Sequence, residues 1–256
     1  MPAAGFIPQL TKDFVRWWRE QARKLGPFGA VRLLVRELWE FLRDSMPEQR
    51  RRRFGDMEFD WEHRVNTTSG TVGWRERLLG VFLSGYQPTE PAAFRQMMAS
   101  LPIDFAGFTF IDLGSGKGRT LLMASEYSFR RIVGVEILPE LHRIAEQNIH
   151  DYSGARRCAD VRSVCADACQ FTFPEDPLVL YLFNPLSASG LASVLRNLEE
   201  SLRQVPRPAL LLYYNPVLEQ HLRDCAFLEL VQRGEHFAVF AHRPSASLNE
   251  RMAVSI

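Results

Sequence analysis

The sequence predicts an α/β fold in which a mostly parallel sheet is covered by helices and has an antiparallel edge. From residue 91 onward, short apolar runs alternate with stretches of helical period, which is the pattern of βα units. The apolar run 109–113 leads into three glycines at alternate positions and then into a helical segment, 119–127. Strand, glycine turn and helix in this order are the layout of a nucleotide-binding βα unit.

The other elements of this domain follow the same alternation. Further strands are predicted over 132–136, 161–167, 177–184 and 208–215. Helices are predicted over 91–101, 139–152, 187–204 and 217–225. The last two strands, 227–231 and 236–241, are expected to pair antiparallel at one edge of the sheet.

The chain before residue 91 has a different character. Residues 1–53 are predicted as a helical extension with amphipathic helices at 11–25 and 29–44, which carry many arginines. Residues 54–90 are predicted as a lid region, irregular up to residue 75 and helical over 74–84, and 91–256 as the α/β domain. A plain linker is the alternative for residues 54–75. Two interpretations of the extension stay open: a contact surface for an anionic membrane, a nucleic acid or a partner helix, and a helical cap with solvated arginines.

The glycine turn carries the first functional signal. Gly114, Gly116 and Gly118 allow backbone angles that a Cβ forbids and let a ligand approach the main chain closely. Asp112 precedes the turn where a dinucleotide-binding strand is usually apolar, and Arg119 stands where such a fold needs a small residue. Both features argue against an NAD-linked enzyme.

A carboxylate follows at the end of the second strand. Glu136 closes the apolar run 132–136, 20 residues after Gly116. An acid at this place can accept hydrogen bonds from both hydroxyls of a ribose.

These residues carry a resemblance to a known family. Asp112-Leu-Gly-Ser-Gly-Lys-Gly118, followed by Gly134-Val-Glu136, resembles motif I and its successor in class I S-adenosylmethionine-dependent methyltransferases. The resemblance covers roughly residues 86–244 and implies a Rossmann-like seven-stranded methyltransferase sheet. It also implies S-adenosylmethionine as the cofactor, with the glycine turn facing its methionine and ribose. The implied cofactor-binding residues are Tyr86, Thr89, Asp112, Gly114, Ser115, Gly116, Gly118, Glu136, Ile137, Asp167, Ala168 and Asn184.

Two parts of this set rest on further resemblances. In the family, an acid after the third strand accepts from the adenine amino group, and Asp167 with Ala168 stands at that place. Asp167 as a residue that only caps or turns the chain is the alternative. Tyr86-Gln-Pro-Thr89 before a helix resembles the entry of non-SET protein-lysine methyltransferases, in which this loop folds over the cofactor.

Asn184 is the candidate catalytic residue. It ends the strand 177–184 and is followed by Pro185, which cannot donate to a ladder. The pair partly resembles the Asn-Pro-Pro-aromatic motif of amino methyltransferases, but Leu186 and Ser187 stand in place of the second proline and the aromatic residue. Two interpretations of Asn184 stay open: it accepts a hydrogen bond from an amine, or it is a turn residue that ends the strand.

Composition excludes several other classes. The net charge of +1 argues against a nucleic acid as the partner of the whole chain. No apolar run approaches the roughly 20 residues of a membrane span, and the N-terminus lacks the pattern of a signal peptide, so we expect a cytoplasmic protein. The four cysteines and six histidines do not fall into metal-binding spacings, so no metal is expected and the thiols are predicted to be free and buried.

With this resemblance, the sequence predicts an S-adenosylmethionine-dependent methyltransferase that acts on an amine or another nucleophile, in a protein lysine or a small molecule. The alternative is a non-catalytic module that binds the cofactor and acts through its N-terminal helices. The sequence does not identify the acceptor.

Overall fold

The structure is a computed structural model that describes residues 57–67, 88–184, 186–242 and six isolated positions, 23, 26, 28, 29, 31 and 32. The chain divides into two compact units, one of residues 1–55 with 71–86 and one of 56–70 with 87–256. All described helices and strands belong to the second unit. Apart from those six positions, the predicted helices 11–25, 29–44 and 74–84 lie outside the described residues, as does Tyr86. The predicted domain boundaries stay predictions.

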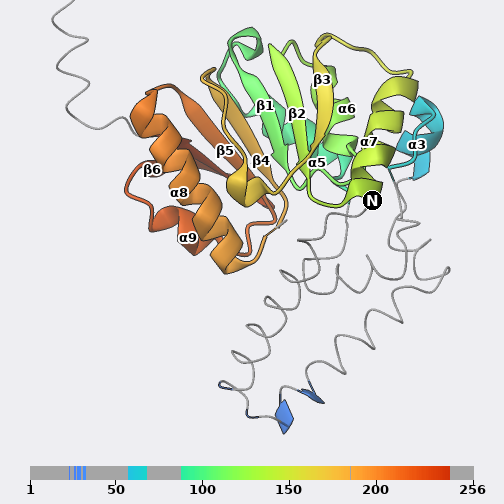
Figure 1. The fold of residues 1–256 in the computed structure, drawn as a ribbon. Coiled ribbons are helices and arrows are strands. Elements are labelled where there is room, and N and C mark those ends of the chain that lie inside the picture. Colours follow the sequence, from blue (N-terminus) through green and yellow to red (C-terminus); the bar gives the residue numbers. More distant parts are fainter. Residues whose placement is uncertain are drawn as a thin grey trace, which may run out of the picture. The chain divides into compact units, whose positions relative to one another are not determined.

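A seven-stranded sheet with the order β3-β2-β1-β4-β5-β7-β6 forms the centre of this unit (Figure 1). The first five strands in this order are parallel, and β7 pairs antiparallel with both β5 and β6. The predicted fold class is confirmed, including the antiparallel edge. The strands are β1 (Thr109–Leu113), β2 (Arg131–Glu136), β3 (Val161–Cys165), β4 (Leu178–Leu182), β5 (Ala209–Tyr214), β6 (Leu228–Arg233) and β7 (Phe237–His242).

The helices begin and end where local chemistry favours it. Proline occupies the first turn of α7, where its missing N–H costs nothing, and the Ser187 hydroxyl accepts from the Gly190 N–H at the start of α8. One prediction is wrong: residues 57–63, expected to be irregular, form a helix. The helices are α3 (Met57–His63), α5 (Pro91–Ala99), α6 (Arg119–Ser125), α7 (Pro139–Asp151), α8 (Ala188–Gln204) and α9 (Glu219–Arg223), with short 3₁₀ helices η1 (Phe105–Gly107) and η2 (Ala168–Gln170).

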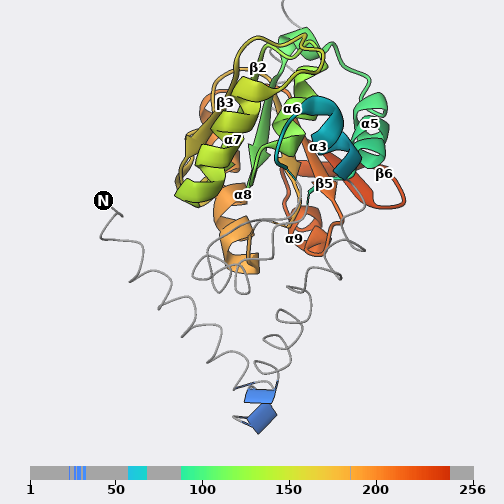
Figure 2. The ribbon, with the colours of Figure 1, turned by 90° about the vertical axis from the view of Figure 1, so that its right-hand side faces the viewer.

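The core has two layers because the parallel strands are buried on both faces. Ile111 and Leu113 of β1 pack on the face covered by α8, whereas Phe110 packs with α5 and α6 on the other (Figures 1 and 2). Asp112 follows the same alternation and therefore faces α6, with its hydrogen bond to Thr120. None of the helices in the described ranges has the length and apolarity to cross a membrane.

Candidate functional site

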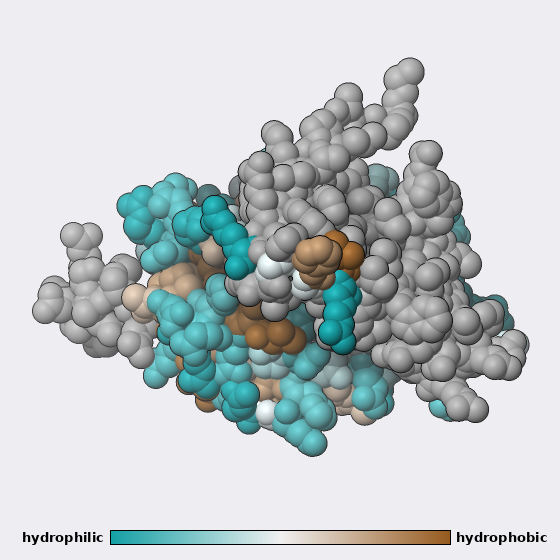
Figure 3. Space-filling view, turned by 90° about the horizontal axis from the view of Figure 1, so that it is seen from below, coloured by the Kyte–Doolittle hydropathy of each residue, from teal (hydrophilic) through white to brown (hydrophobic). Residues whose placement is uncertain are grey.

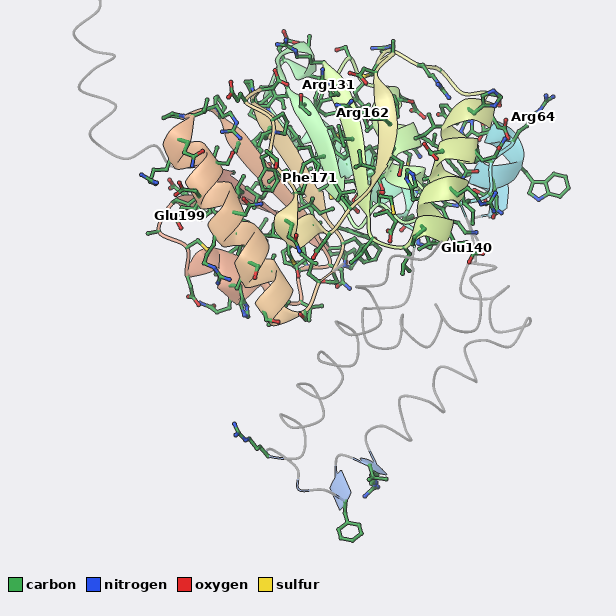
Figure 4. The ribbon with its side chains drawn as sticks, viewed as in Figure 1. Arg64, Arg131, Glu140, Arg162, Phe171 and Glu199 are labelled. Carbon is green, nitrogen blue, oxygen red and sulfur yellow. The ribbon has the colours of Figure 1, made fainter. Side chains whose placement is uncertain are left out.

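The parallel strands end together at one edge of the sheet. Figure 4 places Arg131 and Arg162, at the starts of β2 and β3, at the upper edge and Glu140, just after β2, at the lower edge. The lower edge therefore holds the residues that follow the strands, which is where open α/β sheets bind ligands. Figure 3 looks at this edge from below and shows hydrophobic and hydrophilic atoms side by side on its described part.

The glycine turn between β1 and α6 adopts the backbone that its sequence requires. Gly114, Gly116 and Gly118 have φ angles of 81°, 54° and 83°, in the left-handed region that favours glycine. The N–H groups of Gly114 and Ser115 donate to the carbonyl of Val135, which fixes the turn to the neighbouring strand. Ser115 Oγ is buried beneath the turn. Among the buried side-chain nitrogen and oxygen atoms of the described ranges, it is the only one without a hydrogen-bond partner.

Glu136 lies against this turn. One carboxylate oxygen accepts the Gly116 N–H at 2.8 Å, and the other accepts the Leu138 N–H at 2.8 Å. Burial raises the pKa of Glu136, and the hydrogen bonds from the backbone of Leu138, Gly116 and Ile137 oppose this rise. The structure thus brings together the two features that the sequence singled out, the glycine turn and the acid after β2.

Asp112 lies beneath the turn on the α6 side. Its carboxylate accepts the hydroxyl of Thr120 at 2.5 Å. Burial raises the pKa of Asp112 to about 7, the hydrogen bond from Thr120 opposes this, and the nearby Glu136 adds to it. Sequence analysis predicted the helical segment that contains Thr120 but did not identify Thr120 as the partner of Asp112.

Two basic residues, Lys117 in the turn and Arg119 at the start of α6, are buried. Lys117 and Arg119 are 0% and 1% exposed, and their side chains contact residues 57–67, a segment that we call the strap. Sequence analysis missed the strap, because its contacts come from residues more than 50 positions away and leave no periodic pattern.

Other predicted cofactor residues occupy the same edge. Asp167 follows β3 and caps η2 by accepting the Cys169 N–H at 2.9 Å, and Ala168 beside it is buried. Ile137 follows Glu136 and is 37% exposed. Thr89, at the entry of α5, is buried and hydrogen-bonded to the Tyr181 hydroxyl at 2.7 Å.

Asn184 is held in a paired turn after β4. Its Nδ2 donates to the carbonyl of Asn215 at 2.7 Å, and its Oδ1 accepts the Tyr213 hydroxyl at 2.7 Å. Asn184 and Asn215 both have a φ of 47°, in the left-handed region, and the hydrogen bond between them ties the turns after β4 and β5 together. These contacts support the turn role of Asn184. Its Oδ1 still has a second lone pair that can accept from a substrate.

An aromatic pair lies next to this turn. The rings of Phe183 and Tyr214 meet edge to face at 4.8 Å between centroids, and both residues are half-buried. Burial raises the pKa of Tyr214, and the carboxylate of Glu90 adds to this rise. An aromatic pair with a carboxylate nearby favours an apolar or cationic group over an anion.

The described residues contain no cluster of side chains that could form a metal site, and three of the four cysteines are less buried than predicted. No three His, Cys, Asp or Glu side chains within the described ranges gather in a way that could hold a metal ion. All four cysteines are free, and Cys158 is buried as expected. The prediction of buried thiols is wrong for the other three, because Cys169 and Cys225 are half-buried and Cys165, at the end of the edge strand β3, is exposed.

The chain is similar in structure to several known methyltransferases. The magnesium protoporphyrin IX methyltransferase of Synechocystis PCC 6803, solved with bound S-adenosylmethionine, is 16% identical at a TM-score of 0.46, over 76% of this chain and 95% of that one. An RNA methyltransferase from Salinibacter ruber, solved with S-adenosylhomocysteine, is 22% identical at a TM-score of 0.40, and the match covers 62% of this chain and 97% of that one. A ribosomal protein L11 methylase from Lactobacillus delbrueckii is 14% identical at a TM-score of 0.44, and the match covers 62% of this chain and 80% of that one.

No protein-family model matches the chain, and no curated protein matches its sequence. The assignment of the fold rests on the strand order and register of the chain itself.

Proposed function

We propose that this chain is an S-adenosylmethionine-dependent methyltransferase that acts on an amine. The observation that carries the proposal is the Glu136 carboxylate, which lies 2.8 Å from the Gly116 N–H at the edge where the parallel strands end. A buried acid against a glycine turn provides acceptors for a ribose beside a backbone that a ligand can approach closely.

The residues at this edge fit an adenosine-containing ligand. Glu136 would hold the ribose hydroxyls, and the exposed side chain of Ile137 would cover one face of the adenine. Asp167 would accept from the adenine amino group, with Ala168 beside the ring. The glycine backbone at 114–118 would lie against the methionine part, with Asp112 and Thr89 beneath it.

The reaction asks little of the protein beyond placement. When bound, the cofactor supplies an electrophilic methyl group on a sulfonium. The chain has to place an acceptor in line with that methyl group and exclude water. Asn184 Oδ1 would accept a hydrogen bond from the amine and orient its lone pair, and the Phe183–Tyr214 pair would contact the carbon atoms around it. A protein lysine and a small-molecule amine both fit this chemistry.

A second function is favoured by the contacts of Asn184. Because its amide nitrogen and oxygen are both engaged within the paired turn, the edge could bind the cofactor without presenting a catalytic group. The chain would then be a cofactor-binding module that acts through its N-terminal residues.

Two measurements on the full chain separate these functions. Calorimetric titration with S-adenosylhomocysteine and with NAD tests the cofactor, and tight binding of NAD alone would overturn both proposals. Transfer of labelled methyl from S-adenosylmethionine into a host-cell extract, sorted into protein, nucleic-acid and small-molecule fractions, tests catalysis. Label in the protein or small-molecule fraction supports the amine methyltransferase, and binding without label supports the module.

A further inference from the structure

The strap, residues 57–67, contacts the glycine turn through directed polar groups. The strap consists of α3 and the four residues after it. The chain turns at Arg64, which has a φ of 57°, and the Val65 N–H donates back to the Asp60 carbonyl at 3.0 Å. Figure 4 shows Arg64 on the outer side of α3, away from the sheet. The reversal directs Asn66 and Thr67 towards the residues on either side of Gly118.

Lys117 is the first of these residues. Its ammonium donates to Asn66 Oδ1 at 2.8 Å, and its side chain is completely buried. A charged donor leaves water only where a well-placed acceptor replaces it. The side chain of Asn66 is such an acceptor, so it helps to determine where Lys117 and the backbone on either side of it lie.

Asn148 of α7 joins the strap to the turn. Its Nδ2 donates to the carbonyls of Lys117 and Asn66 at 2.9 and 3.0 Å, and its Oδ1 accepts the Asn66 N–H at 2.8 Å. One buried side chain thus satisfies three backbone groups from two segments. Ala145, one turn earlier on α7, is close enough that a Cβ on Gly118 would lie 3.1 Å from its Cβ.

Arg119, on the other side of Gly118, contacts the strap through Thr67 and Asp60. Its Nε donates to Thr67 Oγ1 at 2.6 Å, and its NH2 lies 3.3 Å from an Asp60 carboxylate oxygen. The Thr67 hydroxyl and N–H both donate to Asp60, and the guanidinium lies over the Phe59 ring at 5.0 Å. Polar contacts of this kind are sensitive to angle as well as distance, so they determine one conformation of the turn more sharply than apolar packing would.

We propose that Asn66 and Asn148 are positioning residues for the cofactor, which act by holding the glycine turn at Lys117 in its binding conformation. This inference rests on the proposed function, because it assumes that the turn contacts the cofactor. Asn66 contacts the turn on the side of the strap, through Lys117 and Asn148, and its role is to keep the backbone N–H groups of residues 116–118 oriented.

Calorimetric titration of the full chain with S-adenosylhomocysteine tests the proposal. Asn66→Ala removes the Oδ1 atom that accepts from the Lys117 ammonium but keeps the backbone groups that contact Asn148. We expect it to raise the dissociation constant about tenfold, the effect of losing one hydrogen bond to a charged group. Asn66→Asp keeps an acceptor and should bind within about twofold of the natural chain. Gln147→Ala, an exposed amide next to Asn148 on α7, is the matched control.

Two results would overturn the proposal. One is an Asn66→Ala variant that binds with the natural dissociation constant although its Tm is lower, since the strap would then support only the fold. The other is equal weakening by Asn66→Ala and Asn66→Asp, since the acceptor for Lys117 would then be irrelevant. Failure of the natural chain to bind S-adenosylhomocysteine would instead overturn the proposed function, before any variant is compared.

Hydrogen exchange of the ligand-free chain gives a readout that does not depend on the cofactor. The Gly118 N–H donates to the Ser115 carbonyl within the turn. Asn66→Ala should speed exchange at Gly116 and Gly118 selectively, whereas Gln147→Ala should not. Unchanged exchange at these two amides in Asn66→Ala would contradict the positioning role.

Discussion

The carboxylate of Glu136 accepts the N–H of Gly116, and these residues lie 20 positions apart on either side of α6. This contact joins the end of β2 to the middle of the glycine turn. In the ligand-free chain it satisfies a buried acid, and it leaves that acid facing the place where we propose that a ribose binds.

The role of Glu136 can be tested with an isosteric change. Glu136→Gln replaces one acceptor oxygen with an NH2 group, which would oppose either the Gly116 or the Leu138 N–H. We expect the dissociation constant for S-adenosylhomocysteine to rise by about tenfold or more, measured by calorimetric titration. Glu199→Gln, on the exposed side of α8, is the matched control (Figure 4). Natural affinity in Glu136→Gln would remove this residue from the cofactor site.

The protonation of Asp112 should make stability depend on pH. Its pKa is raised from 3.8 to about 7 by burial, so between these values the folded chain holds a proton that the unfolded chain has lost. The free energy of unfolding should therefore fall as pH rises from about 4 to about 7, with a slope from this group of up to about 1.4 kcal/mol per pH unit. The raised pKa of Glu136 acts in the same direction.

Asp112→Asn isolates this contribution, because its amide oxygen still accepts from Thr120. Urea unfolding at several pH values should give a shallower slope for this variant than for the natural chain. Asp104→Asn, at the exposed cap of η1, is the control substitution. Equal slopes in the natural chain and Asp112→Asn would show that Asp112 does not hold the proton.

The acceptor role of Asn184 predicts a separation of binding from turnover. Asn184→Ala should leave the dissociation constant for S-adenosylhomocysteine within about twofold and lower methyl transfer on the order of a hundredfold, because the amine loses its orientation. Asn197→Ala is the control, because it removes another side-chain amide that donates to a backbone carbonyl, that of Phe171. If both variants keep full activity, Asn184 serves only the paired turn.

Gly134 is predicted to be sensitive because it lies under the glycine turn. A Cβ added there would lie 2.6 Å from Leu121 Cδ1 and 2.6 Å from Ser115 Oγ. We expect Gly134→Ala to lower the free energy of unfolding by about 1–3 kcal/mol, measured in urea. At Gly107 an added Cβ meets nothing within 4 Å, so Gly107→Ala should be close to neutral. Equal stabilities for the two variants would contradict the close contact.

The sequence predicted the elements whose patterns are local. Three glycines after an apolar run predicted the turn at 114–118 because its backbone angles exclude other residues. The apolar period of 187–204 predicted α8, and Ser187 begins it as a cap. Both signals lie within a few positions of the structure that they predict.

The strap and the paired turn could not be predicted in this way. Asn66 contacts Lys117 and Asn148, which lie 51 and 82 positions away in the sequence. A polar contact between such distant residues produces no periodic pattern of residue types that sequence analysis could detect. The Tyr213 contact to Asn184 depends on the register of β5 against β4, which periodicity does not determine. Each of these contacts changes how a predicted site residue can act.

The strap also limits where the chain can be shortened. A fragment that begins at residue 91 would retain every strand of the sheet, yet it would lack Asp60, Asn66 and Thr67. Lys117 would then lose its hydrogen bond to Asn66, and Arg119 would lose its contacts with Thr67 and Asp60, although both side chains are buried in the natural chain. Expression screens for a minimal soluble fragment should therefore keep residues 57–67, even though they precede the first strand by more than 40 positions.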